Sequence, residues 1–84
     1  QLLSVLALVT TPMAALAMPA VGDMIGTDPA TAKAALEKAG CTVDSFGAED
    51  GKVEAKCTDV ATGKSAEVYI DPASGKVVGV KIKN

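Results

Sequence analysis

The spacing of apolar residues changes along the chain, and each spacing predicts a different element. Residues 2–9 form an almost unbroken apolar run. Residues 30–39 place Ala and Leu at intervals of three and four, which predicts a helix with one shallow apolar face. From residue 41 onward apolar and polar residues alternate, as in strands with one buried face. The sequence therefore predicts an α+β domain behind an apolar leader.

The predicted helix has a defined start and end. Thr27 and Asp28 are capping residues, and Pro29 suits the first helical position. Gly40 follows the last helix-forming residue and predicts the stop. The apolar stripe consists of Ala32, Ala35, Leu36 and Ala39. A stripe made mostly of Ala brings the helix close to a sheet and leaves little volume for a pocket.

Four strands are predicted after the helix, separated by three turns. The turns are expected at 49–51, 61–64 and 71–76, and each contains a glycine. The positions expected to face the core recur at every second residue. They are Cys41, Val43, Ser45, Val53, Ala55, Cys57, Ala66, Val68, Ile70, Val78, Val80 and Ile82. We expect an N-terminal helix packed on one face of a four-stranded antiparallel β-meander, with the other face in water.

Residues 1–17 are typical of a secretory signal peptide. The apolar run is followed by a proline and then by a small-residue site with Ala15 and Ala17 at its two key positions. Cleavage is expected before Met18, and the positively charged part of the signal is expected to precede Gln1. The mature protein is therefore expected in the periplasm or outside the cell.

The rest of the chain is predicted to divide into a linker, 18–26, and a domain, 27–84. A transmembrane anchor over residues 2–21 is the alternative to a cleaved signal, because about 20 apolar residues span a bilayer. Two threonines and a proline in the middle of that stretch argue against an anchor. We expect no stable membrane anchor once the signal is cleaved.

Cys41 and Cys57 are the only cysteines, and an even number in an exported chain predicts a disulfide. Folding a hairpin about Glu49 places Cys41 opposite Cys57 and Val43 opposite Ala55, close enough for such a bond. A redox pair is usually C-x-x-C, and a structural zinc site needs four Cys or His ligands. Unpaired thiols are the remaining alternative.

The composition limits the chemistry of the domain. The chain has 84 residues, eight Lys or Arg against ten Asp or Glu, a net charge of −2 and no His. The lysines form no basic run, so nucleic acid is not expected as a partner. Without His and with a thin core, we expect no enzyme activity, no catalytic residues and no cofactor. Glu49 and Asp50 lack the EF-hand arrangement, so no metal site is expected.

The polar face of the predicted sheet is the candidate surface for a partner. A sheet face or a free strand edge can bind another protein. The candidate residues are Glu54, Lys56, Glu67 and Tyr69. Asp71, Pro72 and Gly75 are interpreted as turn residues, because Asp before Pro commonly accepts hydrogen bonds within its own loop.

The turns and apolar positions resemble the PepSY domain family. The resemblance rests on Gly40 with Val43, on Asp50-Gly51 leading into residues 53–55, on Gly63, and above all on the run Val-Tyr-Ile-Asp-Pro-Ala-Ser-Gly-Lys-Val-Val at 68–78. It covers about residues 27–80. This chain has valine where the family often has an aromatic after the Asp-Gly turn, and the cysteine pair is not part of the general pattern.

The resemblance implies a role in the cell envelope. PepSY domains occur in propeptides of secreted metallopeptidases and in bacterial envelope proteins, and they are proposed to restrain peptidases. The expected function is thus a small binding module whose partner is a peptidase or another envelope protein. No catalytic residues are established for the family, so none is carried over. The alternative is an envelope sensor or carrier of a small molecule or metal ion.

Overall fold

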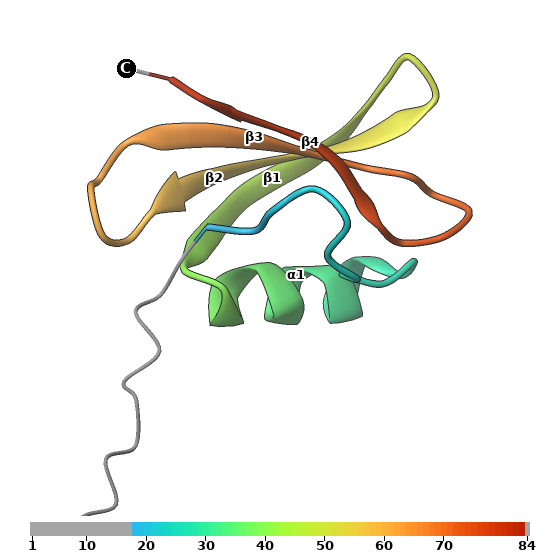
Figure 1. Ribbon diagram of the computed structural model, residues 1–84, viewed down its shortest axis with the longest axis horizontal. Helices are drawn as coiled ribbons and strands as arrows, with labels where there is room; N and C mark the ends of the chain where they lie inside the picture. Colours follow the sequence, from blue (N-terminus) through green and yellow to red (C-terminus); the bar gives the residue numbers. More distant parts are fainter. Residues whose placement is uncertain (1–17, 84) are drawn as a thin grey trace, which may run out of the picture.

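The computed structural model describes residues 18–83, which form one helix and four strands. The elements are α1 (Pro29–Lys38), β1 (Cys41–Glu49), β2 (Lys52–Asp59), β3 (Ser65–Ile70) and β4 (Val77–Ile82). The strands form one antiparallel sheet in the order β1-β2-β3-β4, with α1 against one face (Figure 1). The predicted α+β meander is thereby confirmed. The predicted leader, including Ala15 and Ala17, lies outside the described residues.

Helix α1 begins and ends where the sequence predicts. Asp28 is the N-cap, and its carboxylate accepts a hydrogen bond from the Thr31 backbone N–H at 3.0 Å. Hydrogen bonds from the side chain and backbone of Thr31 lower the pKa of the Asp28 carboxyl. Gly40, at φ 94°, ends the helix, and Leu36 is fully buried beneath it. No helix within residues 18–83 is long and apolar enough to cross a membrane.

The first hairpin has a different register from the one predicted. Val43 pairs with Cys57 and Cys41 pairs with Asp59, so the predicted pairing of Cys41 with Cys57 is wrong. The reason is the position of the turn. Asp50 and Gly51 both have positive φ, 52° and 75°, and they form a two-residue turn between Glu49 and Lys52. The hairpin is therefore centred between Asp50 and Gly51, whereas the prediction centred it on Glu49.

Shifts in register change which side chains of the two edge strands face the core. An irregularity between Val43 and Ser45 reverses the alternation in β1, so Phe46 packs against the core and Ser45 is exposed. A second shift at the start of β4 buries Val77 and leaves Val78 44% exposed. The expected inward positions of Ser45 and Val78 are therefore wrong.

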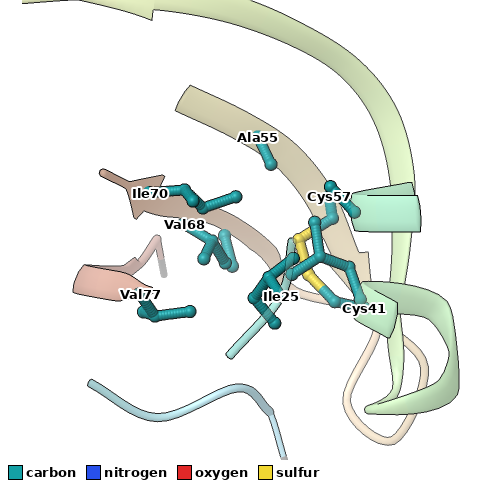
Figure 2. Close-up of a cluster of buried hydrophobic side chains, with 10 residues drawn as sticks. Ile25, Cys41, Ala55, Cys57, Val68, Ile70 and Val77 are labelled. Carbon is teal, nitrogen blue, oxygen red and sulfur yellow. A yellow bond between two sulfur atoms is a disulfide. The ribbon is translucent and has the colours of Figure 1, made fainter. Parts of the chain in front are cut away.

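The disulfide between Cys41 and Cys57 is present and lies inside the core (Figure 2). The two Cα atoms are 5.4 Å apart, and both residues are at most 1% exposed. They are diagonal neighbours across β1 and β2, not directly opposed residues. The other core residues are Ile25, Ala32, Leu36, Ala55, Ala66, Val68, Ile70 and Val77. The core is thus built from a cystine and small aliphatic side chains.

The segment predicted as a linker is packed against the sheet. Met18 packs against the core, and Ile25 belongs to it. Backbone hydrogen bonds run from the Gly22 N–H to the Val77 carbonyl at 2.8 Å and from the Ile25 N–H to the Gly75 carbonyl at 2.7 Å. Because α1 packs mainly over β1, this segment covers the part of the inner face near β4 (Figure 1). These residues belong to the folded unit and are not a linker.

Candidate functional site

The outer face of the sheet, the side turned away from α1, holds the four residues predicted to bind a partner. The register places Glu54 opposite Tyr69 and Lys56 opposite Glu67, on the central strands β2 and β3. No element of residues 18–83 covers this face (Figure 1). The side chains nevertheless shield one another, since Glu54 and Glu67 are each only 9% exposed. The carboxylates of this face are therefore less exposed to water than those of an ordinary sheet surface.

Tyr69 and Glu67 are fixed by a hydrogen bond and an ion pair. The Tyr69 hydroxyl donates to Glu67 Oε1 at 2.9 Å, and Lys83 Nζ lies 3.0 Å from Glu67 Oε2. Hydrogen bonds from Lys83 and then from Tyr69 lower the pKa of the Glu67 carboxyl. The bond to Glu67 raises the pKa of the Tyr69 hydroxyl well above its ordinary value. At neutral pH the carboxylate is charged and the phenol keeps its proton.

The Tyr69 ring occupies the space above a glycine of β4. Gly79 lies directly opposite Tyr69, and a Cβ atom at position 79 would be 3.5 Å from Tyr69 Cδ2. Sequence reasoning did not identify Gly79 or Lys83 as part of this surface. The available signal was the spacing of two residues between Gly79, Lys81 and Lys83, along β4 and just after it, which places all three on the outer face.

Charge on the outer face is divided between its two ends. Glu49 and Glu54 lie near the β1–β2 turn, where hydrogen bonding with Glu54 and then repulsion from it raise the pKa of Glu49. Asp50 adds a carboxylate there, and Lys52 lies opposite Glu49. Lys56, Lys81 and Lys83 lie at the other end together with Glu67 and Asp44, so that end carries a small excess of positive charge. Among residues 18–83, no three His, Cys, Asp or Glu side chains are grouped so that they could hold a metal ion.

An apolar cleft of about 270 Å³ lies on the inner side of the sheet, beside the start of α1. Pro29 and Ala32 of the helix form one wall, and Phe46 of the edge strand forms another. Val53 and Ile70 also line it. The small-residue helix face led us to expect little room for a pocket. The cleft is present, and the short Ala32 side chain of that helix face lines it together with Phe46.

Comparison with known families gives a match over almost the whole chain. Residues 1–81 match the family described as peptidase propeptide and YPEB domain, PepSY_2. The chain belongs to this PepSY family. PepSY domains are non-catalytic modules of the propeptide or inhibitor type, typically found in exported proteins. No curated protein and no solved structure matches the chain.

The residues that carry the PepSY resemblance have structural positions in this chain. Val68 and Ile70 are core residues. The Asp71 carboxylate accepts hydrogen bonds from the Ala73 N–H at 3.0 Å and from the Ser74 hydroxyl at 3.1 Å. The β3–β4 loop also contains Pro72 and Gly75, and the Gly75 N–H donates to the Asp71 carbonyl at 2.8 Å. The family pattern therefore describes how the domain folds, while Tyr69 of this run lies on the outer face opposite Glu54.

Proposed function

We propose that this PepSY domain is an exported, non-catalytic binding module that restrains a peptidase through the outer face of its sheet. The observation that carries the proposal is the fixed patch formed by Tyr69, Glu67 and Lys83 on an uncovered face. Side chains already held in one conformation lose little entropy when a partner binds. The patch is therefore pre-organised for recognition.

The chemistry of the patch suits a protein partner. Tyrosine is enriched in protein interfaces because its ring is apolar and its hydroxyl can still form hydrogen bonds. Tyr69 lies at the centre of the sheet, between Glu54 on β2 and Gly79 on β4. The division of charge on this face would fix the orientation of a partner with the opposite arrangement, acidic beside the lysines and basic beside Glu49.

The same geometry supports a role without catalysis. The Tyr69 hydroxyl, bonded to the charged Glu67 carboxylate, keeps its proton and is a poor base or nucleophile at neutral pH. The sequence contains no His that could take up a proton. The patch offers hydrogen bonds and charge to a partner, which is what binding requires.

The position of Met18 supports export with cleavage at the predicted site. Met18 packs against the core, and the hydrogen-bonded segment beside β4 follows it. Cleavage between Ala17 and Met18 would release the leader and leave the folded unit complete. Cleavage a few residues further on would remove part of the packing under β4.

Capture from an envelope extract of the producing cell tests the proposal. The protein, with its disulfide intact, is immobilised as wild type and as the double variant Tyr69→Ala, Glu67→Lys, and the bound proteins are identified by mass spectrometry. The expected result is enrichment of a peptidase by the wild type and its loss with the variant. Lys33→Glu, a charge change on the exposed side of α1, is the matched control and should retain the peptidase.

Unfolding curves of each variant separate loss of binding from loss of structure. Equal capture by wild type and double variant would contradict the use of this face.

The alternative function, a carrier or sensor of a small molecule, is favoured only by the apolar cleft. That cleft lies just below the usual size of small-molecule pockets, roughly 300–1,000 Å³.

A further inference from the structure

We infer that the free edge of β1 and the apolar cleft beside α1 together bind an extended peptide segment of a partner protein, with an apolar residue flanked by basic ones. This site is separate from the outer face, so it goes beyond the function proposed above. Its two parts recognise different features of one ligand. The strand edge recognises an extended backbone, and the cleft recognises a side chain.

The edge of β1 presents backbone groups that point away from the sheet. β1 is the outermost strand, with β2 as its neighbour in the sheet. The two-residue turn makes Glu49 and Lys52 a hydrogen-bonded pair, and such pairs alternate along an antiparallel ladder. Phe46 and Ala48 therefore direct their N–H and C=O groups outward. An added strand would pair with these groups.

The cleft lies where a side chain of that added strand would point. Successive side chains of a strand alternate between the two faces of a sheet, so every second residue of the ligand would face the side occupied by α1. Phe46 and Gly47 of the edge strand line the cleft together with Pro29 and Ala32 of α1. An apolar side chain placed there would be enclosed by Phe46, Val53 and the start of the helix.

The two edges of the sheet are protected to different degrees. Natural edge strands are commonly blocked by lysine, by proline or by covering segments. The β4 edge carries Lys81 with Lys83 just after the strand, and residues 22–25 pair beside its start. The stretch 45–48 of β1, Ser-Phe-Gly-Ala, has none of these features. The β1 edge is therefore the edge open to strand addition.

Acidic groups around the cleft set the charge of the ligand. Asp28 lines the cleft, and Asp71 lies between two lining residues, Ile70 and Pro72. Glu49 follows Ala48 at the end of the free edge. A segment with Lys or Arg on either side of its apolar residue matches this rim, whereas an acidic segment is repelled.

A peptide titration followed by NMR tests the site. The probe is the blocked heptapeptide Lys-Thr-Val-Leu-Thr-Val-Lys, added to the isotope-labelled exported protein with its disulfide intact. We expect saturable shift changes confined to residues 26–32, 46–48, 53 and 70–72, with slower hydrogen exchange at the Phe46 and Ala48 amides. The same peptide N-methylated at alternate amides should not bind, because methylation blocks strand pairing.

Two proline variants locate the binding edge. Ala48→Pro removes an outward N–H that the sheet does not use, so the fold is retained and affinity should fall about tenfold or more. Ile82→Pro makes the matched change on the β4 edge and should leave affinity unchanged. Val53→Thr keeps the side-chain shape and makes the cleft more polar, so it should weaken binding even if Ala48→Pro fails to fold. Lys38→Ala, at the opposite end of α1 from the cleft, should leave the affinity for the peptide unchanged.

Several outcomes would overturn the inference. They are the absence of saturable shifts, equal binding of the methylated peptide, and shifts centred on β4. Sedimentation distinguishes a second copy of the chain as occupant. A concentration-dependent dimer that Ala48→Pro abolishes would show that the edge pairs with itself, which contradicts a peptide ligand.

Discussion

The two faces of the sheet carry different kinds of side chain. The inner face carries the Cys41–Cys57 disulfide and a core of small aliphatic residues, covered by α1 and by residues 18–26. The outer face carries two largely buried carboxylates, a tyrosine and lysines, with Glu67 held by Tyr69 and Lys83. Both faces are ordered, the first by packing and a covalent bond and the second by polar contacts.

This difference separates stability from recognition. A domain of this size buries a smaller fraction of its surface than a larger one, roughly 60%, so the inner face must supply most of the free energy of folding. Polar contacts at a surface contribute little to stability because water competes for them. Changes on the inner face should therefore unfold the protein, while changes on the outer face should alter binding and pH response.

The largest expected effect is the loss of the disulfide. The double variant Cys41→Ala, Cys57→Ala should lower the free energy of unfolding by about 3 kcal/mol, because the bond restricts the unfolded chain over a sequence separation of 16 residues. Urea unfolding of the wild type and the variant measures the difference. A loss well below 1 kcal/mol would show that packing alone holds the inner face together.

The next effect tests whether residues 18–26 are part of the inner face. Ile25→Ala should lower stability by about 2–4 kcal/mol, because it empties a buried position under β4. Val21→Ala in the same segment is the matched control, since Val21 is 66% exposed and should change stability by less than about 0.5 kcal/mol. Similar small losses in both variants would mean that this segment contributes little to the fold.

A pair of glycine variants tests how closely that segment approaches the β3–β4 loop. Gly63 and Gly75 both have φ of 76°, so an alanine at either site carries the same backbone strain, roughly 1–2 kcal/mol. At Gly75 the added Cβ would also lie 2.8 Å from the carbonyl carbon of Gly26, whereas Gly63 has no neighbour within 4 Å. Thermal unfolding should show the larger loss for Gly75→Ala. Equal losses would contradict the close approach.

The smallest effect concerns the pH response of the outer face. The pKa of Glu67 is lowered by folding, so its contribution to stability is present above its ordinary value of 4.5 and is lost as the pH falls through the lowered pKa. The pKa of Glu49 is raised by folding, so ionisation of Glu49 is less favourable in the folded state. Glu49 therefore lowers the stability of the fold as the pH rises through the raised pKa. The two carboxyls therefore have opposite effects at neutral pH.

Two variants isolate these effects. At pH 7 Lys83→Met should be slightly less stable than the wild type, and Glu49→Gln slightly more stable. Both differences should shrink on acidification below pH 4.5, where the carboxyls become protonated. Unfolding curves between pH 3 and pH 8 measure this. Differences that persist unchanged at low pH would show that charge on the outer face is not their cause.

The sequence predicts the elements of this fold well because their ends are marked by local chemistry. Asp28, Pro29 and Gly40 determine the limits of α1, and alternation identifies the strands. The register was not predictable in the same way. The bulge in β1 has no hydrophobic signature, and a one-residue shift moves every following side chain to the other face. Phe46 was missed as a core residue for that reason.

On the candidate surface, too, the features within one strand were predictable and the contacts between different elements were not. The outward positions of Glu54 and Tyr69 follow from alternation within single strands. The ion pair with Lys83 depends on how β3 and β4 meet, and the cleft depends on where the start of α1 lies relative to Phe46. Such features join residues far apart in the chain, and a single sequence gives no direct record of them.

The most direct test of the account is a titration of peptidase activity in the envelope extract with the purified protein. The central claim predicts that wild type and Lys33→Glu lower the activity in a saturable way. The double variant Tyr69→Ala, Glu67→Lys should not lower it, although its unfolding curve shows a folded protein. Unchanged activity with the wild type, or equal inhibition by the double variant, would contradict the claim that the outer face restrains a peptidase.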